Sequence, residues 1–362
     1  MIPLSFRSLK TAFDRDIGPG ALSFVLSFGL CLAGCTSGPS RPSSLDTLRE
    51  DLPLTLNHPE GITELLDGVV VGSELVAVGD GGTIIHSTDS GQTWEKSDVP
   101  VQSTLTGVSF AADAQHGWAV GHDALILASA DGGRTWQKQW QGENRAAWFL
   151  DVHALDEHRA VAVGKNGLYV ETSDGGATWI RRKLIEQDFD LNRISRGPSG
   201  TLYLAGEHGT ALRSTDRGVD WTQLDIPADH TLSGILPVDS HTLIAYGGSM
   251  SGNIYRSGDD GQTWVAVRLV PRKLLLKTAL ITHDGSILLA GISGDWREDG
   301  FRGFFFSRDG ARSFGPWPFA PSRVKDQSKS SALVNLIELI QAPDGSLVAL
   351  GTEGATIVGR SE

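Results

Sequence analysis

The chain has 362 residues, and its 31 lysines and arginines against 43 aspartates and glutamates give a formal net charge of −12. This acidic balance argues against a general nucleic-acid-binding protein, which normally carries a basic face. The 44 glycines and 10 tryptophans, with only 2 cysteines, are typical of an all-β chain with many tight turns. Both cysteines lie within the first 35 residues, which excludes a disulfide-linked scaffold.

The first 34 residues have the pattern of an export signal. Arg7, Lys10 and Arg15 precede an apolar stretch at residues 21–32, which is shorter than the ~20 residues of a membrane-spanning helix. This stretch ends in Leu-Ala-Gly-Cys, which resembles the bacterial lipobox. By that resemblance, Cys35 would carry a diacylglyceryl group and become the mature N-terminus. A plain signal peptide is the alternative.

Polar residues follow the predicted anchor. Thr36, rather than an aspartate, comes after Cys35, and the bacterial sorting pattern then favours the outer membrane. We therefore expect an exported protein that is lipid-anchored in the cell envelope and faces the periplasm, with a flexible tether at residues 35–50. The folded domain expected at residues 51–362 contains no cysteine, which excludes thiol catalysis and cysteine-ligated metal there.

An eight-residue motif recurs along this domain. It reads STDSGQTW at 87–94, SADGGRTW at 129–136, TSDGGATW at 172–179, STDRGVDW at 214–221 and SGDDGQTW at 257–264, with a degenerate copy, SRDGARSF, at 307–314. The five tryptophans, at positions 94, 136, 179, 221 and 264, are 42 or 43 residues apart. Strand-like runs flank each copy, and about 42 residues with four short strands is the size of a propeller blade.

The glycine that closes the second strand of each unit gives the number of units. It recurs seven times, at Gly79, Gly121, Gly164, Gly206, Gly247, Gly291 and Gly351. The chain stops soon after the third strand of the seventh unit, and residues 52–57 have the length and alternation of the missing fourth strand. The sequence therefore predicts an all-β, seven-bladed β-propeller whose ring is closed by the N-terminal strand.

The recurring motif is known as the Asp-box, or BNR repeat. Its aspartate can accept hydrogen bonds from turn amides, its glycine can take a positive φ, and its tryptophan can bury a large ring between blades. We expect these residues to be structural and to bind no metal, because the spacing is not that of a Ca²⁺ loop. They are Asp89, Trp94, Asp131, Trp136, Asp174, Trp179, Asp216, Trp221, Asp259, Trp264 and Asp309.

A functional site is expected on the face opposite the Asp-boxes, among the loops between second and third strands and between blades. Several of these loops are basic, although the protein is acidic, and one long insertion at 294–302 carries aromatic residues. A basic patch there could bind an acidic peptide or lipid headgroups, whereas isolated solvated side chains are the alternative. The candidate partner-binding residues are Arg145, Arg181, Arg182, Lys183, Arg193, Arg272, Lys273, Trp296 and Arg297.

Asp-box propellers include sialidases and other glycoside hydrolases, so catalysis has to be considered. The Arg-Ile-Pro signature of sialidases is absent, and all four tyrosines fall on predicted strands or their ends. Alignment of the first strands places Glu64, Asp151, Arg193 and Glu338 at equivalent positions near the channel. Two of these carboxylates could form a glycosidase pair, but pairing with Arg193 is the favoured interpretation. We therefore predict no catalytic residues.

The unit at residues 107–136, GVSFAADAQHGWAVGHDALILASADGGRTW, closely resembles the photosystem II stability/assembly factor family, and the resemblance extends over residues 60–358. It implies a monomeric, non-enzymatic scaffold without a cofactor, which holds a protein subunit of a membrane complex and binds no nucleic acid. A carbohydrate-active propeller is the alternative function. Photosystem II assembly itself, in a photosynthetic host, is a third possibility. These functions stay open because proteins with the same fold can have different functions.

Overall fold

The computed structural model describes residues 61–249, 253–269, 274–293, 304–316, 336–352 and 354–360, all within the compact unit Pro42–Glu362. The predicted signal at 1–34, the anchor Cys35, the tether and the closing strand at 52–57 lie outside the described residues. Within the described ranges, no helix has both the length and the apolar composition needed to cross a membrane.

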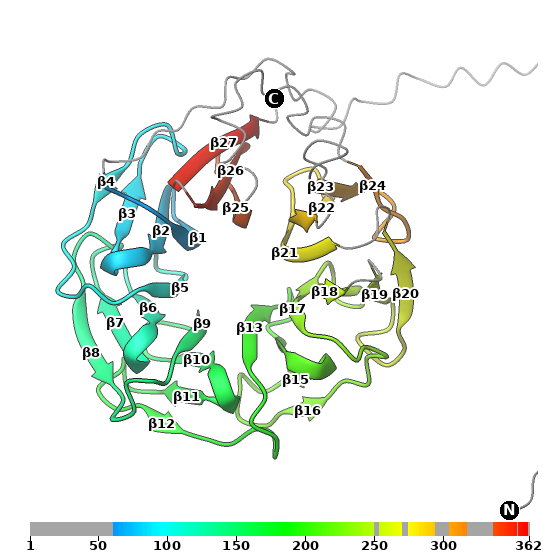
Figure 1. Ribbon diagram of the computed structural model, residues 1–362, viewed down its shortest axis with the longest axis horizontal. Helices are drawn as coiled ribbons and strands as arrows, with labels where there is room; N and C mark the ends of the chain where they lie inside the picture. Colours follow the sequence, from blue (N-terminus) through cyan, green and yellow to red (C-terminus); the bar gives the residue numbers. More distant parts are fainter. Residues whose placement is uncertain are drawn as a thin grey trace, which may run out of the picture. The chain divides into compact units, whose positions relative to one another are not determined.

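Most strands belong to antiparallel meanders whose strands run in chain order from the centre of the molecule outward (Figure 1). Four meanders form separate four-stranded sheets. They are β1–β4 (Leu65–Val71, Glu74–Gly79, Ile84–Ser87, Glu95–Lys96), β5–β8 (Leu105–Phe110, Gly117–Gly121, Leu125–Ser129, Gln137–Gln141), β9–β12 (Phe149–Ala154, Ala160–Gly164, Tyr169–Thr172, Ile180–Arg181) and β13–β16 (Leu191–Arg196, Leu202–Gly206, Ala211–Ser214, Thr222–Gln223).

The next two meanders are joined into one eight-stranded sheet, which differs from the expected separate blades. They are β17–β20 (Leu232–Pro237, Leu243–Ser249, Asn253–Ser257, Val265–Arg268) and β21–β24 (Leu274–Ile281, Ile287–Ser293, Phe304–Ser307, Gly315–Pro316). The cause is the length of β18, which continues past Gly247 so that Gly248 and Ser249 pair with the start of β21. The remaining sheet has three described strands, β25–β27 (Leu336–Gln341, Ser346–Gly351, Gly354–Arg360).

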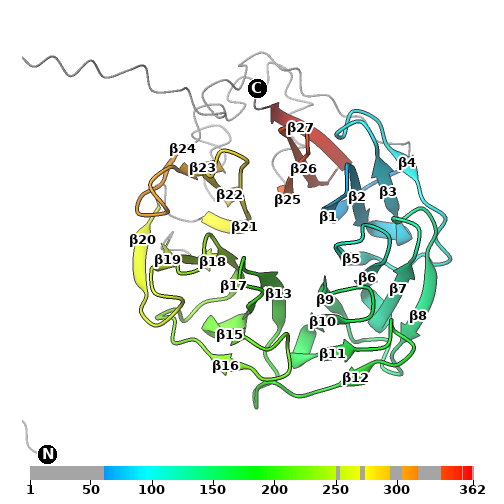
Figure 2. The same cartoon turned by 180° about the vertical axis from the view of Figure 1, so that it is seen from behind.

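The first strands of the meanders surround the centre of the ring of sheets, which we call the channel (Figures 1 and 2). Each of β1, β5, β9, β13, β17, β21 and β25 contacts the next, and β25 contacts β1, which completes the circuit. The second strands are almost fully buried, whereas the outermost strands are largely exposed. This arrangement confirms an all-β propeller.

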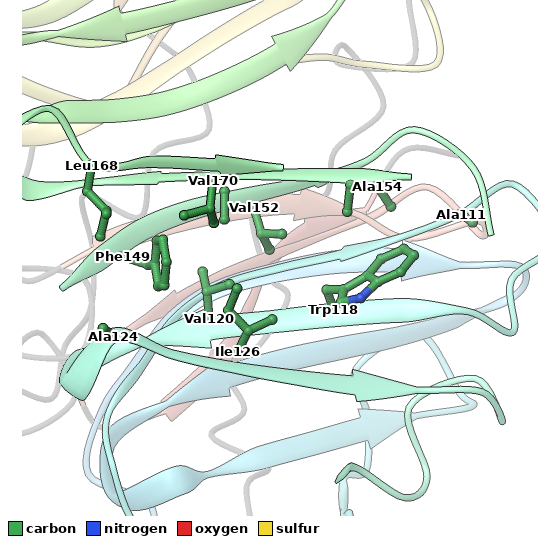
Figure 3. Packing of buried hydrophobic residues seen from close by; sticks show 12 residues of the cluster. Ala111, Trp118, Val120, Ala124, Ile126, Phe149, Val152, Ala154, Leu168 and Val170 are labelled. Atoms are coloured by element: carbon green, nitrogen blue, oxygen red, sulfur yellow. The ribbon is translucent and has the colours of Figure 1, made fainter. Parts of the chain in front are cut away.

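A hydrophobic cluster fills the space between each meander and the next, and one more lies between β25–β27 and β1–β4. Figure 3 shows the cluster between the second and third sheets, in which Trp118, Val120 and Ile126 face Phe149 and Val152. Because side chains alternate along a strand, each sheet contributes one apolar face to each of its two neighbours. Burial between sheets therefore provides the main stabilisation.

The recurring glycine at the end of each second strand is required by a close backbone contact. A Cβ atom on Gly79, Gly121 or Gly164 would lie only 2.0–2.1 Å from the carbonyl oxygen of the residue preceding its own first strand. The amide that follows each of these glycines donates a hydrogen bond to that same carbonyl, as Lys165 does to the Trp148 oxygen at 3.0 Å. Any side chain here would separate the first and second strands.

The SxDxGxTW motif forms the turn between the third and fourth strands. In its second copy, the Ser129 hydroxyl donates to Asp131 Oδ1 at 2.9 Å, and the amide of Gly133 donates to Ser129 Oγ at 2.9 Å. The Thr135 amide and hydroxyl donate to the two oxygens of Asp131. Hydrogen bonding lowers the pKa of the equivalent Asp174 to about 2. The carboxylate thus organises the turn by accepting hydrogen bonds from its amides and hydroxyls.

The motif tryptophans differ in burial. Trp94 and Trp136 are 7% and 3% exposed, whereas Trp179, Trp221 and Trp264 are half-buried against their clusters. The Trp136 indole donates to the Gly133 carbonyl at 2.9 Å and packs edge-on against Phe110. The motif tryptophan is therefore most completely buried in the first two copies.

Candidate functional site

One register position of the first strands supplies the groups that surround the channel. In every first strand the pairing with the second strand shifts by one residue, and the residue just after this bulge occupies the same position in each meander. The seven equivalent residues are Asp67, Gly107, Asp151, Arg193, Gly234, Thr278 and Glu338.

The expected place of Glu64 in this set is wrong. Glu64 lies three residues before Asp67, ahead of β1, where it forms a bridge with Thr352. The same bulge occurs in every first strand, so the equivalent position is the second residue after the buried residue that begins the strand, as Asp67 follows Leu65 and Asp151 follows Phe149. Asp67 is the carboxylate that sequence reasoning missed.

An ion pair crosses the channel. Arg193 on β13 donates from Nη2 to Glu338 Oε2 on β25, and Thr278 Oγ1 on β21 donates to the other oxygen of Glu338. The strands β13 and β25 are not neighbours in the circuit, so this pair connects two separate parts of the ring. The predicted pairing of a channel carboxylate with Arg193 is thereby confirmed for Glu338.

The other two carboxylates are held by the backbone of the following meander. Asp67 Oδ2 accepts a hydrogen bond from the Val108 amide at 2.8 Å, and Asp151 Oδ2 accepts one from the Ile194 amide at 2.7 Å. Burial raises the pKa of Asp151 to about 6, and burial followed by the charge of Glu338 raises the pKa of Asp67 well above its usual range. These bonds tie neighbouring first strands together.

The loops between second and third strands form the opposite face from the SxDxGxTW turns. Four of them are short 3₁₀ turns, η1 (Asp80–Gly82), η2 (His122–Ala124), η3 (Lys165–Gly167) and η4 (Glu207–Gly209), as expected for exposed loops. Their central residues, Gly81, Asp123, Asn166 and His208, have φ between 52° and 63°, in the left-handed region. We call this surface the loop face.

An aromatic stack lies on the loop face between the second and third meanders. The Trp148 ring stacks on His122 with 4.1 Å between centroids, and Lys165 Nζ lies 4.3 Å from the centroid of Trp148. In the next meander, Phe189 lies against His208 at 4.5 Å. Sequence reasoning missed Trp148 and Phe189. The detectable signal was an aromatic residue just ahead of a first strand, in a loop already expected to be functional.

Three of the predicted basic residues, which are consecutive in the sequence, lie at a cavity. Arg181, Arg182 and Lys183 line a cavity of about 360 Å³ with Asn166 and Gly167 of η3. Arg181 is exposed, whereas Lys183 lies 3.6 Å from Glu186.

Arg182 has a different environment from its two neighbours. Its guanidinium pairs with Glu171 at 3.1 Å and donates to the Val219 carbonyl at 2.6 Å, so it joins two meanders. Arg145 is exposed in the loop between β8 and β9, and Arg193 lies in the channel. Arg272, Lys273, Trp296 and Arg297 lie outside the described residues.

Some acidic side chains of the loop face accept hydrogen bonds within the protein, whereas others are exposed. Asp80 accepts a hydrogen bond from Thr104 Oγ1 at 2.5 Å, and Asp123 accepts one from Ser103 Oγ at 2.6 Å. Glu186 is 94% exposed, and Asp188 lines the same cavity as Arg181. No cluster of three or more histidine, cysteine, aspartate or glutamate side chains that could hold a metal occurs in the described ranges. The cavity at η3 is therefore lined by both basic and acidic side chains.

The repeats of this chain match a known protein family. A family described as "Photosynthesis system II assembly factor YCF48" matches residues 92–148 and 139–271.

The chain belongs to the photosystem II assembly factor-like family of β-propellers.

Solved structures show the same fold as this assembly factor-like chain. YCF48 bound to D1 peptide is 19% identical with a TM-score of 0.63, covering 86% of this chain and 95% of that one. YCF48 from Cyanidioschyzon merolae is 17% identical with a TM-score of 0.61, covering 82% and 95%. The GH74 xyloglucanase from Xanthomonas campestris is 14% identical with a TM-score of 0.63, covering 82% of this chain and 52% of the enzyme. A sequence search of curated proteins found no match.

Proposed function

We propose that this propeller is a non-enzymatic assembly scaffold whose loop face holds an acidic segment of a membrane-complex subunit. The observation that carries the proposal is the set of basic side chains at η3, where Arg181, Arg182 and Lys183 line one cavity and Lys165 Nζ lies over the Trp148 ring. Such a surface attracts a negatively charged segment, and Trp148 offers it an aromatic anchor. A photosystem II-type partner is supported by family membership and by the solved relative bound to D1 peptide.

The channel carboxylates favour this function over glycoside hydrolysis. A hydrolase needs one carboxyl group as acid and another as nucleophile or base, both directed at a substrate. Here Glu338 is bound by Arg193 and Thr278, and Asp151 accepts two backbone amides. The alternative, a carbohydrate-active propeller, thus has less support from the geometry of the described residues.

Charge reversal on the loop face tests the scaffold. We expect the double variant Lys165→Glu and Arg181→Glu to bind an acidic D1 peptide about tenfold or more weakly than the wild-type chain, with a weaker dependence on salt. Isothermal titration of both proteins measures the affinity. Lys138→Glu, on the exposed outer strand β8, is the matched control and should bind normally. Equal loss in the control, or unchanged binding in the double variant, would contradict the proposal.

We further infer a seven-bladed ring that is closed by residues 52–57 and anchored to the outer membrane by a lipid on Cys35. Seven recurring glycines, the closed circuit of first strands and the three-stranded sheet β25–β27 support the count. A fourth strand along β27 would protect the outer edge of that sheet.

Two truncations separate the anchor from the closing strand. A chain beginning at residue 51 should leave the membrane fraction, as should Cys35→Ser, and should keep its thermal midpoint. A chain beginning at residue 61 should also leave the membrane but unfold several degrees lower, because the last sheet loses a strand. Equal midpoints for the two truncations would refute the closing strand. Retention of Cys35→Ser in the membrane would refute the lipid anchor.

A further inference from the structure

The channel cluster has more acid than base. Three carboxylates, Asp67, Asp151 and Glu338, share one guanidinium, that of Arg193, and the two aspartates use their oxygens to accept backbone amides of the next meander. The Tyr246 hydroxyl approaches from the second strand β18, where it occupies the space over Gly234 that a Cβ would need. With all three carboxyls ionised, the half-buried cluster would carry two uncompensated negative charges, which is unfavourable away from bulk water.

His153 does not supply the missing positive charge. It lies two residues after Asp151 on β9, and its Nε2 is buried without a hydrogen-bond partner. Burial, followed by the charge of Arg196, lowers the pKa of His153 to about 4, so this ring is neutral at pH 7. The charged or titratable groups that the surrounding strands contribute are Asp67 from β1, Asp151 and His153 from β9, Arg193 and Arg196 from β13, Tyr246 from β18, Lys277 from β21 and Glu338 from β25.

We propose that the channel cluster is a proton-binding site, in which Asp67 and Asp151 each bind one proton, so that Glu338 alone stays ionised beside Arg193 and the charge balance that stabilises the ring is complete. The inference is independent of the partner bound by the loop face. The protons come from water, and no other group changes its bonding. The stability of the folded ring therefore depends on pH. A metal ion would be the other way to supply charge, but no set of metal ligands converges here among the described residues.

The direction of the pH effect follows from linkage. Asp67 and Asp151 have raised pKa values in the fold, whereas an aspartate in an unfolded chain titrates near pH ~3.9. The folded protein therefore binds more protons than the unfolded chain between pH ~4 and pH ~6 for Asp151, and to a higher pH for Asp67. The contribution of the cluster to stability is complete at the acidic end of this window and is lost as the pH rises through it.

Thermal unfolding of the full chain from pH 4.5 to pH 8 tests the site. Asparagine imitates a protonated aspartate and keeps an oxygen for the backbone amide, so Asp67→Asn/Asp151→Asn should unfold roughly 2–4 °C above wild type at pH 8. This difference should shrink steadily toward pH 4.5, because Asp67 and Asp151 of the wild-type chain are then protonated. Comparing the two proteins at each pH removes the effect of all other acids. Glu143→Gln, an exposed carboxylate in the β8–β9 loop, is the control and should show no such trend.

Two results would overturn the proposal. One is a difference between variant and wild type that does not change with pH. The other is a wild-type midpoint at pH 8 that rises with added calcium and then no longer depends on pH, since the cluster would then bind a cation. If the double variant fails to fold, infrared spectroscopy of the wild-type chain decides the question. A neutral carboxyl band at pH 6.5 that is weaker in Asp67→Asn supports the site, and the absence of such a band refutes it.

Discussion

Replacing Trp136 by alanine is expected to lower the free energy of unfolding by about 3–5 kcal/mol. Its ring is 3% exposed and lies in the cluster between the first and second meanders, in edge contact with Phe110. The substitution removes this packing and also the indole hydrogen bond to the Gly133 carbonyl. Urea unfolding followed by circular dichroism measures the loss.

Trp264→Ala provides a control within the same motif. Trp264 makes the same indole bond, to the Gly261 carbonyl at 3.1 Å, but its ring is only half-buried. We expect about half the loss seen for Trp136, because less apolar surface returns to water. Equal losses would mean that the hydrogen bond in the turn, rather than burial between sheets, gives the tryptophan its role.

Replacing Arg193 by methionine should destabilise the protein at pH 7 by about 3–5 kcal/mol, because removing one partner of a buried ion pair leaves the other without compensation. Glu338 is 7% exposed by side chain and would then face Asp67 and Asp151 with no guanidinium between them. Denaturant unfolding measures this effect.

The double variant Arg193→Met/Glu338→Leu tests whether the loss comes from the uncompensated charge. It should recover most of the stability, since replacing both partners by apolar groups of similar size is often neutral. A double variant as unstable as Arg193→Met would show that the arginine acts through packing. Arg182→Met, which breaks the more exposed pair with Glu171, should cost clearly less.

Much of the fold could be predicted because it repeats. The 42- or 43-residue spacing of the tryptophans gives the unit length, and the serine, aspartate and glycine of each motif place one turn between two strands. The recurring glycine marks a close backbone approach that no other residue permits. These signals are local, so they can be recognised in one sequence.

The parts that could not be predicted depend on register and on contacts between distant residues. The acidic residue at the inner register position is Asp67 rather than Glu64, and the two added residues of β18 joined two meanders into one sheet. In the basic run at residues 181–183, Arg181 is exposed, whereas Arg182 is hydrogen-bonded to the next meander. A run of like charges in sequence does not show which of its members the fold already uses.

The hydrogen bonds between neighbouring first strands have a consequence for how the repeated units evolve. Thr106 donates to the Phe149 carbonyl, Asn192 to the Leu232 carbonyl and Ser233 to the Leu276 carbonyl, so in each case a side chain recognises main chain. Main-chain groups are the same in every unit, whatever the side chains. A duplicated unit would therefore fit beside almost any other, and the side chains could diverge afterwards. This interchangeability accounts for relatives that keep the ring at 17–19% identity.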